Sequence, residues 1–367
     1  MTSETTKMKQ QSTLLTRGAS LIEGVLNLLF LLLYLMAWVA PVVSPCLTQI
    51  PALLNLAFLP LLALLICLLL LYLLRQKWYY FFAYFGLFLL SSPYIFTYLP
   101  LHYGKGLHTH PPLRLLTYNV AGMSYTDSSG HPLALQEILR QNAHIVALQE
   151  APSLPWLRKT LGKQYPYIYK KRYQSPALLS KYPILWSKEI EYPTFANGSV
   201  AHYIELPQGQ HLLLVNNHME SYAMKQGEIE EYRSFLTQLR IRELPKQILE
   251  VQRRLGPKLK QRAVAAELVR QAVRHYIQEL SPNAVILLGD LNDTPMSYTY
   301  TQLRDGRRDA FRETGLGLGT SFSVPPLHFR IDHLLYSGQI EAIGSCIPSR
   351  KQSSDHNPLI VDFRILE

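Results

Sequence analysis

The sequence predicts an α/β protein in which transmembrane helices precede a sandwich of two β-sheets flanked by helices. Residues 24–74 and 78–101 contain no charged side chain, whereas all 12 histidines follow residue 101. After that point, short runs of β-branched residues and leucine are interspersed with helical patterns in a mixed order. Such an order is typical of two stacked sheets rather than of one parallel sheet.

The two uncharged stretches predict three membrane-spanning helices within residues 21–101. A helix of roughly 20 apolar residues crosses a bilayer, so the first stretch has room for two helices. The proline and serine residues between 41 and 51 separate them. We expect spans at 24–44, 51–74 and 78–99. A cleaved signal peptide and buried helices of a soluble core are the alternatives, but the first apolar run is too long for a signal peptide and no small-residue cleavage site follows it.

The positive charges beside these spans predict their orientation. Lysine and arginine near the ends of spans are retained in the cytoplasm. Lys7, Lys9 and Arg17 precede the first span, and Arg75 and Lys77 lie between the second and the third. We therefore expect a multi-pass protein of the cell membrane with a cytoplasmic tail of residues 1–20. Three crossings place the chain after residue 101 outside the cytoplasm.

A linker of residues 102–112 leads to a domain at 113–367, in which several elements are predicted. Strands are expected at Leu113–Asn119, Ile145–Gln149, Leu212–Asn216 and Val285–Leu288, and helices at 133–142 and 262–280. Residues 224–261 have helical spacing that Pro245 and Pro257 interrupt. This segment predicts an inserted helical arm, which either covers the core or binds a ligand.

Polar residues follow or precede the predicted strands at several points. A single glutamate in such a place is usually a surface charge, and a single histidine is usually a core residue. Here they form an ordered set: Asn119, Glu150, His218, Asp290, Asn292, Asp332, Asp355 and His356. Because loops at strand ends hold side chains rigidly over a shared cleft, we expect these residues to form one site.

The ordered set resembles the endonuclease/exonuclease/phosphatase superfamily, also called DNase-I-like. The segments that carry the resemblance occur in family order over residues 113–364: TYNV, ALQE, NNHME, GDLND, RIDHLL and SDHNPL. The resemblance implies a four-layer α/β sandwich with two packed mixed sheets. It also implies a metal-dependent hydrolase that acts on phosphate ester bonds.

The chemistry of phosphodiester hydrolysis assigns expected roles to these residues. Negative charge on the phosphoryl oxygens must be offset while a hydroxide is made nearby, and oxygen ligands suit Mg²⁺ or Mn²⁺. Glu150 is the expected metal ligand, with Asn119 beside it. The resemblance implies that Asp355 contributes to the metal site or its water shell. The resemblance implies that His356 acts as general base or holds the nucleophilic water and that Asp332 orients it.

The resemblance also implies roles for residues that face the substrate. Asp290 would position water or assist the leaving group, Asn292 would orient the phosphate, and His218 would stabilise developing charge. The glycine that usually precedes the strand in YQSPALLSKYPI is missing, so Tyr173 or Gln174 is expected to contact the substrate phosphate.

Two further departures from the family pattern concern residues near the site. Asn217 stands where many relatives have threonine. His333 stands where tyrosine is more common and is expected to have a structural role.

Three functions are compatible with the sequence. The first is a nuclease-like phosphodiesterase, for which the basic stretch at 225–274 would contact nucleic-acid phosphates. The second is a phosphoesterase acting on phospholipids, sphingomyelin or inositol phosphates, for which the bilayer anchor would hold the site near a lipid headgroup. The third is a catalytically silent, membrane-attached binding domain, which is disfavoured because every expected catalytic position retains a competent residue. The sequence does not indicate an oligomeric state.

Overall fold

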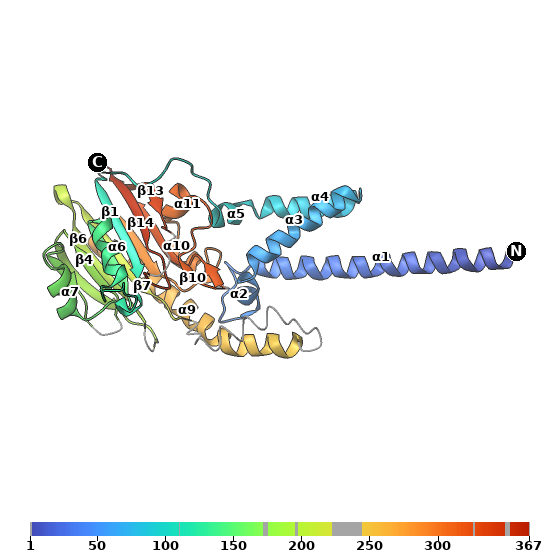
Figure 1. Ribbon diagram of the computed structural model, residues 1–367, viewed down its shortest axis with the longest axis horizontal. Helices are drawn as coiled ribbons and strands as arrows, with labels where there is room; N and C mark the ends of the chain where they lie inside the picture. The colour runs from blue at the N-terminus through green and yellow to red at the C-terminus, as the bar shows by residue number, and fades with distance from the viewer. Residues whose placement is uncertain are drawn as a thin grey trace.

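The computed structural model describes residues 2–109, 111–171, 175–194, 197–221, 244–325, 327–348 and 353–366. An α/β domain begins at Leu113, and the helices of the first hundred residues project from one side of it (Figure 1). The N-terminus lies at the tip of the longest of these helices, and the C-terminus lies at the opposite end of the molecule.

The projecting part consists of helices that differ in length and in apolar character. They are α1 (Thr2–Trp38), α2 (Ile50–Asn55), α3 (Phe58–Leu74), α4 (Trp78–Leu90) and α5 (Ser92–Tyr98). By length and composition, the segment Arg17–Trp38 of α1 can cross a membrane. Helices α4 and α5 pass the same test only as a pair that is bent by 54°, and α3 is apolar but has 17 residues.

The first predicted span and the predicted N-terminal tail belong to one helix. Helix α1 begins at Thr2, so residues of the tail expected at 1–20 are helical. It ends at Trp38, earlier than the expected boundary at residue 44. Pro41 follows closely, and the residue before a proline avoids the helical conformation.

Two prolines divide the other predicted spans. In a continuous helix the ring of Pro60 would collide with the carbonyl group of Leu56, and the chain breaks there into α2 and α3. Pro93 would collide in the same way with the carbonyl group of Leu89, and the bend between α4 and α5 lies at this point. These breaks explain why neither expected span, at 51–74 or at 78–99, is one straight helix.

Buried polar side chains join the projecting helices to one another. The Asn27 amide of α1 donates to the Tyr72 hydroxyl of α3 at 2.6 Å, and the Tyr84 hydroxyl of α4 donates to Asn27 Oδ1. The Tyr34 hydroxyl of α1 donates to Ser91 Oγ at 2.9 Å. In apolar surroundings such hydrogen bonds hold helices together, because the groups have no water to bond instead.

The α/β domain contains two six-stranded sheets. The first has the order β13-β14-β1-β2-β4-β3, and its strands are β1 (Leu113–Asn119), β2 (Ile145–Gln149), β3 (Tyr167–Tyr169), β4 (Ala177–Ser180), β13 (Ile340–Cys346) and β14 (Leu359–Ile365). The second has the order β5-β6-β7-β8-β12-β9, and its strands are β5 (Ile184–Ile190), β6 (Gly198–Glu205), β7 (His211–His218), β8 (Ala284–Asp290), β9 (Arg308–Asp309) and β12 (Asp332–Gly338). A short hairpin of β10 (Phe322–Val324) and β11 (Leu327–Phe329) lies apart from both sheets.

The two sheets pack face to face and carry helices on their outer faces. Residues of both sheets, such as Leu115 and Leu288, share one buried cluster between the sheets. Helices α6 (Leu133–Gln141) and α7 (Leu154–Leu161) pack on the first sheet. Helices α9 (Leu244–Leu280) and α10 (Tyr298–Arg304) pack on the second, and α11 (Ala310–Thr314) joins the inner cluster. The predicted four-layer α/β sandwich is therefore confirmed.

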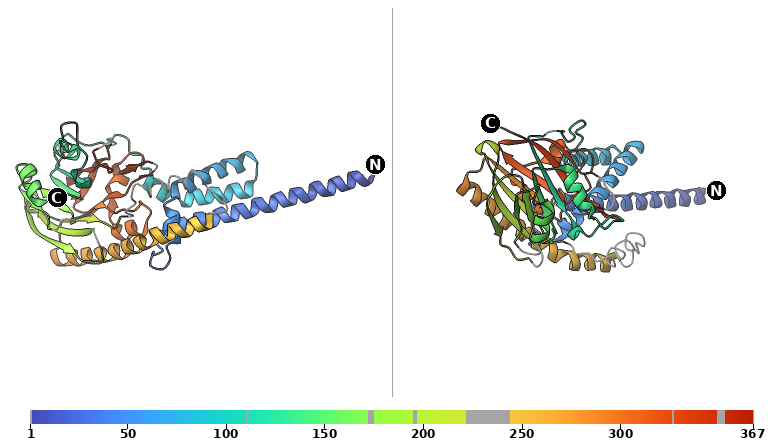
Figure 2. Two further views of the ribbon diagram at one scale, coloured as in Figure 1. Left: turned by 60° about the horizontal axis from the view of Figure 1, so that its bottom comes forward. Right: turned by 60° about the vertical axis from the view of Figure 1, so that its left-hand side comes forward.

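Helix α9 differs from the predicted arm. Residues 222–243 lie outside the described part of the chain, but α9 continues from Leu244 through Pro257 to Leu280 without a break (Figure 2, left). The prediction that Pro257 interrupts the arm is therefore wrong. Contacts on both sides of the proline hold the helix: Gly256 packs against the Gln49 side chain, and Lys258 forms an ion pair with Glu220 at 2.6 Å.

Candidate active site

The predicted site residues gather at one end of the sandwich. Strands β1 and β2 are parallel neighbours, so Asn119 at the end of β1 lies beside Glu150, which directly follows β2. In the other sheet, the parallel strands β7 and β8 place His218 opposite Asp290. Strand β12 runs antiparallel to β8 and places its first residue, Asp332, on the other side of Asp290.

Asn119 connects the two sheets at this end. Its Nδ2 atom donates to Glu150 Oε1 and to Asp290 Oδ2, each at 3.1 Å. Its Oδ1 atom accepts from the backbone N–H of Ala121 at 3.1 Å, which fixes the amide with its nitrogen toward the carboxylates. One buried side chain thus sets the spacing between an acidic residue of each sheet.

Unusual backbone conformations present two of the site residues. Glu150 has φ of 48° and Asn292 has φ of 50°, in the left-handed region that residues with a side chain rarely adopt. Just before Asp290, Gly289 has φ of 122°, and a Cβ atom there would lie 2.0 Å from the carbonyl oxygen of Asn217. Strain of this kind persists where neighbouring structure enforces it and is concentrated at functional sites.

His356 and Asp332 form a buried pair. His356 Nδ1 lies 2.8 Å from Asp332 Oδ2, and His356 Nε2 lies 3.7 Å from Asp290 Oδ2. Burial by itself lowers the pKa of His356, but the carboxylates of Asp332 and Asp290 outweigh it and raise that pKa to about 10. The two carboxylates therefore stabilise the charged form of the imidazole, with one nitrogen held by Asp332 and the other directed toward the centre of the site.

His218 and Asp290 occupy the centre of the cluster. His218 Nε2 lies 3.7 Å from Glu150 Oε1 and 3.8 Å from Asp290 Oδ2. Burial is the main cause that raises the pKa of Asp290, while the histidines His356 and His218 act in the opposite direction. The Asp290 carboxylate therefore lies between the imidazoles of His218 and His356.

Asp355 and Asn292 lie at the margin of the cluster. The Ser354 hydroxyl, which has a single proton to donate, lies 2.9 Å from the carbonyl oxygen of Asn119 and 3.1 Å from Asp355 Oδ1. The backbone N–H of Asn292 donates to Asp290 Oδ1 at 2.8 Å, and its side-chain amide donates to the Met219 carbonyl oxygen at 3.0 Å. Hydrogen bonds with residues next to them in the sequence or in the cluster thus hold both Asp355 and Asn292 in place.

The structure adds supporting residues that the sequence did not single out. Arg262 of α9 is fully buried, and its Nε atom lies 3.6 Å from Asp293 Oδ2. The carbonyl oxygen of Asp293 lies 3.0 Å from His333 Nε2, and burial lowers the pKa of His333 to about 4. This contact agrees with a structural role for His333. Asp293, the second aspartate of GDLND, could have been identified from the sequence as a residue near the site, but nothing in the sequence indicated that Arg262 is its partner.

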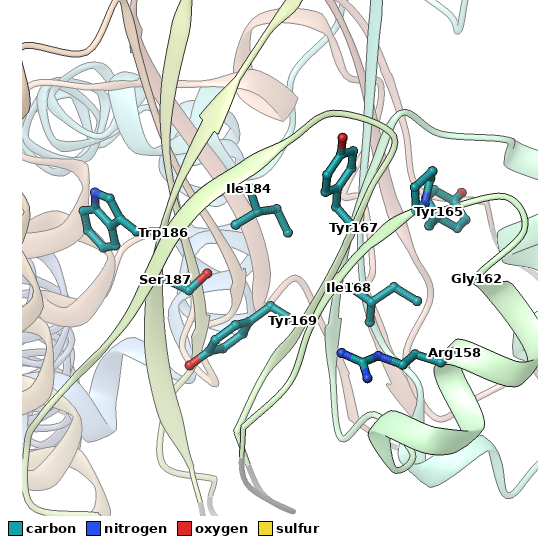
Figure 3. Close-up of a pocket in the computed structure, with 10 residues that line it drawn as sticks. Arg158, Gly162, Tyr165, Tyr167, Ile168, Tyr169, Ile184, Trp186 and Ser187 are labelled. Atoms are coloured by element: carbon teal, nitrogen blue, oxygen red, sulfur yellow. The ribbon is translucent and has the colours of Figure 1, made fainter.

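Two predicted residues and one pocket fall outside this cluster. Tyr173 and Gln174 lie outside the described residues. A pocket of about 530 Å³ opens between α7, β3 and β5, where Figure 3 shows Tyr167 and Tyr169 on β3 and Ile184 and Ser187 on β5. It is lined by none of the predicted site residues.

Two sets of described residues offer ligands for a metal ion. Asp290, Asp332 and His356 each offer one atom, and these atoms lie within 4.8 Å of one another. Nδ1 of His356 is already hydrogen-bonded to Asp332, however. Glu150 and Asp290 present oxygens on either side of Asn119, and the Glu150 side chain is 49% exposed. Oxygen ligands on a side that is open to water fit Mg²⁺ or Mn²⁺, which retain several waters in proteins.

The fold and the site define a hydrolase that acts on phosphate esters. The chain belongs to the endonuclease/exonuclease/phosphatase family, because the family model matches residues 116–356. The resemblance noted from the sequence motifs is thereby confirmed. No curated protein sequence matches the chain.

Solved structures with a similar fold come from several organisms. An endonuclease/exonuclease/phosphatase from Beutenbergia cavernae is 12% identical, with a TM-score of 0.50 over 69% of this chain and 72% of that one. The human Nocturnin catalytic domain with a bound sulfate is 18% identical, with a TM-score of 0.47 over 70% and 96%. A mannosyl-6-phosphatase from Bacteroides thetaiotaomicron is 15% identical, with a TM-score of 0.48 over 69% and 100%. At these identities the likeness concerns the fold alone.

The geometry predicts that His356 and Asp332 act as one unit. His356→Ala should lower turnover of a small diester by about 10²–10⁴-fold, and Asp332→Asn should lower it less. The double variant should be little worse than His356→Ala, because residues that act together are not additive. Steady-state kinetics on the folded variants measures this, with the exposed His131→Ala as control. Losses that multiply in the double variant would contradict the pairing.

Proposed function

We propose that this protein is a divalent-metal-dependent phosphodiesterase anchored in a membrane. The observation that carries the proposal is the cluster at the end of the sandwich, in which Asn119 spaces two carboxylates and a buried His356–Asp332 pair stands beside them. The cluster combines oxygen ligands for a hard cation with an imidazole that a carboxylate orients. Hydrolysis of an anionic phosphodiester requires both.

The expected metal ligands are Glu150, Asn119 and Asp355, and Asp290 faces the same space. When bound, Mg²⁺ or Mn²⁺ would offset charge on the phosphoryl oxygens and lower the pKa of a water molecule. To bind a metal ion, Asn119 would have to rotate its side-chain amide so that Oδ1 faces the site, because Nδ2 faces Glu150 in this structure. Glu150 is the ligand that the geometry supports most directly, since its carboxylate is partly open to solvent.

The protein's own groups would perform the remaining steps. With its pKa lowered by a cation bound beside the carboxylates, His356 would accept a proton from the attacking water at Nε2, while Asp332 holds Nδ1 and balances the positive charge that results. Asp290 lies beside that nitrogen and positions the water or assists the leaving group. His218 and Asn292 donate hydrogen bonds to the phosphate, and Tyr173 or Gln174 remains the predicted further phosphate contact.

The proposal predicts that chelation removes activity. Rigorous treatment with EDTA should abolish hydrolysis of bis(4-nitrophenyl) phosphate, and Mg²⁺ or Mn²⁺ should restore it. Glu150→Gln should weaken metal binding by about tenfold or more, measured by calorimetry, because it removes a charged ligand. The exposed Glu279→Gln is the matched control. Full activity after chelation would exclude this mechanism.

The projecting helices support the membrane anchor and its expected orientation. Lys77 and Arg75, at the turn between α3 and α4, pair with Glu23 of α1, so these charges share one level of the helices. That level lies at the far end from the α/β domain (Figure 1). Positive charge at that end favours a cytoplasmic location for it, which leaves the α/β domain on the other side of a multi-pass anchor.

The orientation can be tested with reporter fusions. A reporter that is active only in the cytoplasm should give no signal after Glu367, because the α/β domain should be extracytoplasmic. The same reporter before Met1 should give a signal and serves as the control. Signal from the C-terminal fusion would reverse the proposed topology.

The position of the site bears on the substrate. Two cations of the basic stretch that a nuclease would use are engaged within the chain: Arg254 pairs with Glu250, and Arg262 is buried beside Asp293. The loop that follows Asp290 instead contacts the N-terminal helices, since Thr294 donates to Asn55 at 2.8 Å. If the helices form the proposed anchor, this contact would bring the site near its surface. It favours the second candidate, a phosphodiester in a lipid headgroup.

Substrate preference separates the two candidates. The full chain in phospholipid vesicles should hydrolyse a phospholipid or sphingomyelin phosphodiester at least about tenfold faster than plasmid DNA or RNA at equal phosphate concentration, because the anchor concentrates the site at the lipid surface. His356→Ala in the same vesicles controls for contaminating activity. Faster cleavage of nucleic acid would restore the nuclease assignment.

A further inference from the structure

Two loops that carry site residues rest directly on the N-terminal helices. The first follows β8, and residues 291–297 within it are all buried. Thr294 Oγ1 donates to Asn55 Oδ1 of α2 at 2.8 Å, and the Asn55 amide lies 3.4 Å from the Ala37 carbonyl oxygen of α1. Met296 is 1% exposed and belongs to the apolar cluster of the helices, together with Tyr34 and Phe58. This loop is therefore part of the helical packing.

The second loop precedes β12 and contacts α5. The buried guanidinium of Arg330 donates to the carbonyl oxygen of Thr97 and to that of Leu318, and it stacks on Phe311 at 4.7 Å from the ring centre. Asp332, which holds His356, follows two residues later. The helices thus contact both the loop that leaves β8 after Asp290 and the loop that enters β12 at Asp332, and these loops lie at the same end of the two paired strands.

The first loop leaves β8 through an uncommon backbone conformation. Asn292 adopts φ of 50°, in the left-handed region that asparagine tolerates better than most residues with a side chain. Contacts within the α/β domain hold its start: Met219 accepts from the Asn292 amide, and the Leu291 N–H donates to Ile331. Arg262 and His333 contact Asp293 in its middle, and the Asn55–Thr294 bond adds a contact there from outside the domain, two residues beyond Asn292. Contacts within the domain and a contact with the N-terminal helices therefore share in holding the loop that carries Asn292.

We propose that the N-terminal helices are a structural component of the active site, with Asn55 acting through Thr294 as a positioning residue. The inference rests on the proposed phosphodiesterase function and adds a requirement to it. Under this proposal the helices do more than attach the domain to a membrane. Loss of the Asn55–Thr294 bond changes the turnover of a soluble substrate that never contacts the bilayer.

The test uses the full chain in detergent, Mg²⁺ and bis(4-nitrophenyl) phosphate. Thr294→Val removes the hydroxyl with little change in shape and should lower kcat by about ten- to a hundredfold with KM nearly unchanged, because small displacements of positioned groups have effects of this size. Thr294→Ser retains the hydroxyl and should recover most of the activity. Asn55→Ala should resemble Thr294→Val, and the double variant should be no worse than either alone.

A matched control separates positioning from general stability. Tyr34→Phe removes a buried hydrogen bond to Ser91 within the same helical cluster but leaves the Asn55–Thr294 and Arg330–Thr97 hydrogen bonds in place. It should lower the thermal midpoint as Thr294→Val does and leave kcat unchanged. An equal loss of kcat in Tyr34→Phe, or unchanged kcat in both Thr294→Val and Asn55→Ala, would overturn the inference. An inactive wild-type protein would instead count against the proposed function itself.

Discussion

The Asn119 amide makes the contact on which the geometry of the site depends. It donates to Glu150 beside its own sheet and to Asp290 of the facing sheet, each at 3.1 Å. Further from the site, Gln149 Nε2 of the first sheet donates to Asn216 Oδ1 of the second at 2.7 Å, and apolar packing, which has no direction of its own, makes up the shared cluster between the sheets. A hydrogen bond is directional, so the Asn119 side chain sets how the ends of β2 and β8 meet.

The remaining features of the site follow from the burial of charge at that point. Asp290 and Asp332 stand on paired strands and are almost fully buried, which is unfavourable for two carboxylates without partners. His356 lies beside both and offsets part of that cost. In the same way, the positive charge of Arg262 lies beside the buried carboxylate of Asp293, three residues after Asp290. The resulting network leaves the imidazole of His356 with little freedom to rotate, as a residue that transfers protons requires.

The sequence was most informative where one physical requirement dominated. The runs LRLLTYN and AVILLGD are buried on both faces, so apolar character alone identified β1 and β8 with nearly the observed ends. It was less informative where local and tertiary effects compete. Pro257 disfavours a helix locally, yet contacts of Gly256 and Lys258 with other elements hold α9 continuous. Pro60 and Pro93, by contrast, could have been used to predict the breaks in the apolar helices. The collision of a proline ring with the preceding helical turn is a local effect that does not depend on tertiary contacts.

The sequence by itself determined the family, the order of the site residues along the chain and the residue types available for chemistry, because each motif is a short segment whose pattern reflects its own strand and turn. Only the tertiary structure decided which of these residues touch. Asp332 and His356 are 24 positions apart, and Asn119 and Asp290 are 171 apart, so their hydrogen bonds depend on strand register and on the packing of two sheets. The contact between Thr294 and Asn55 joins segments 239 positions apart. No local pattern encodes such pairings, since they exist only once the apolar faces of distant elements have been buried against one another.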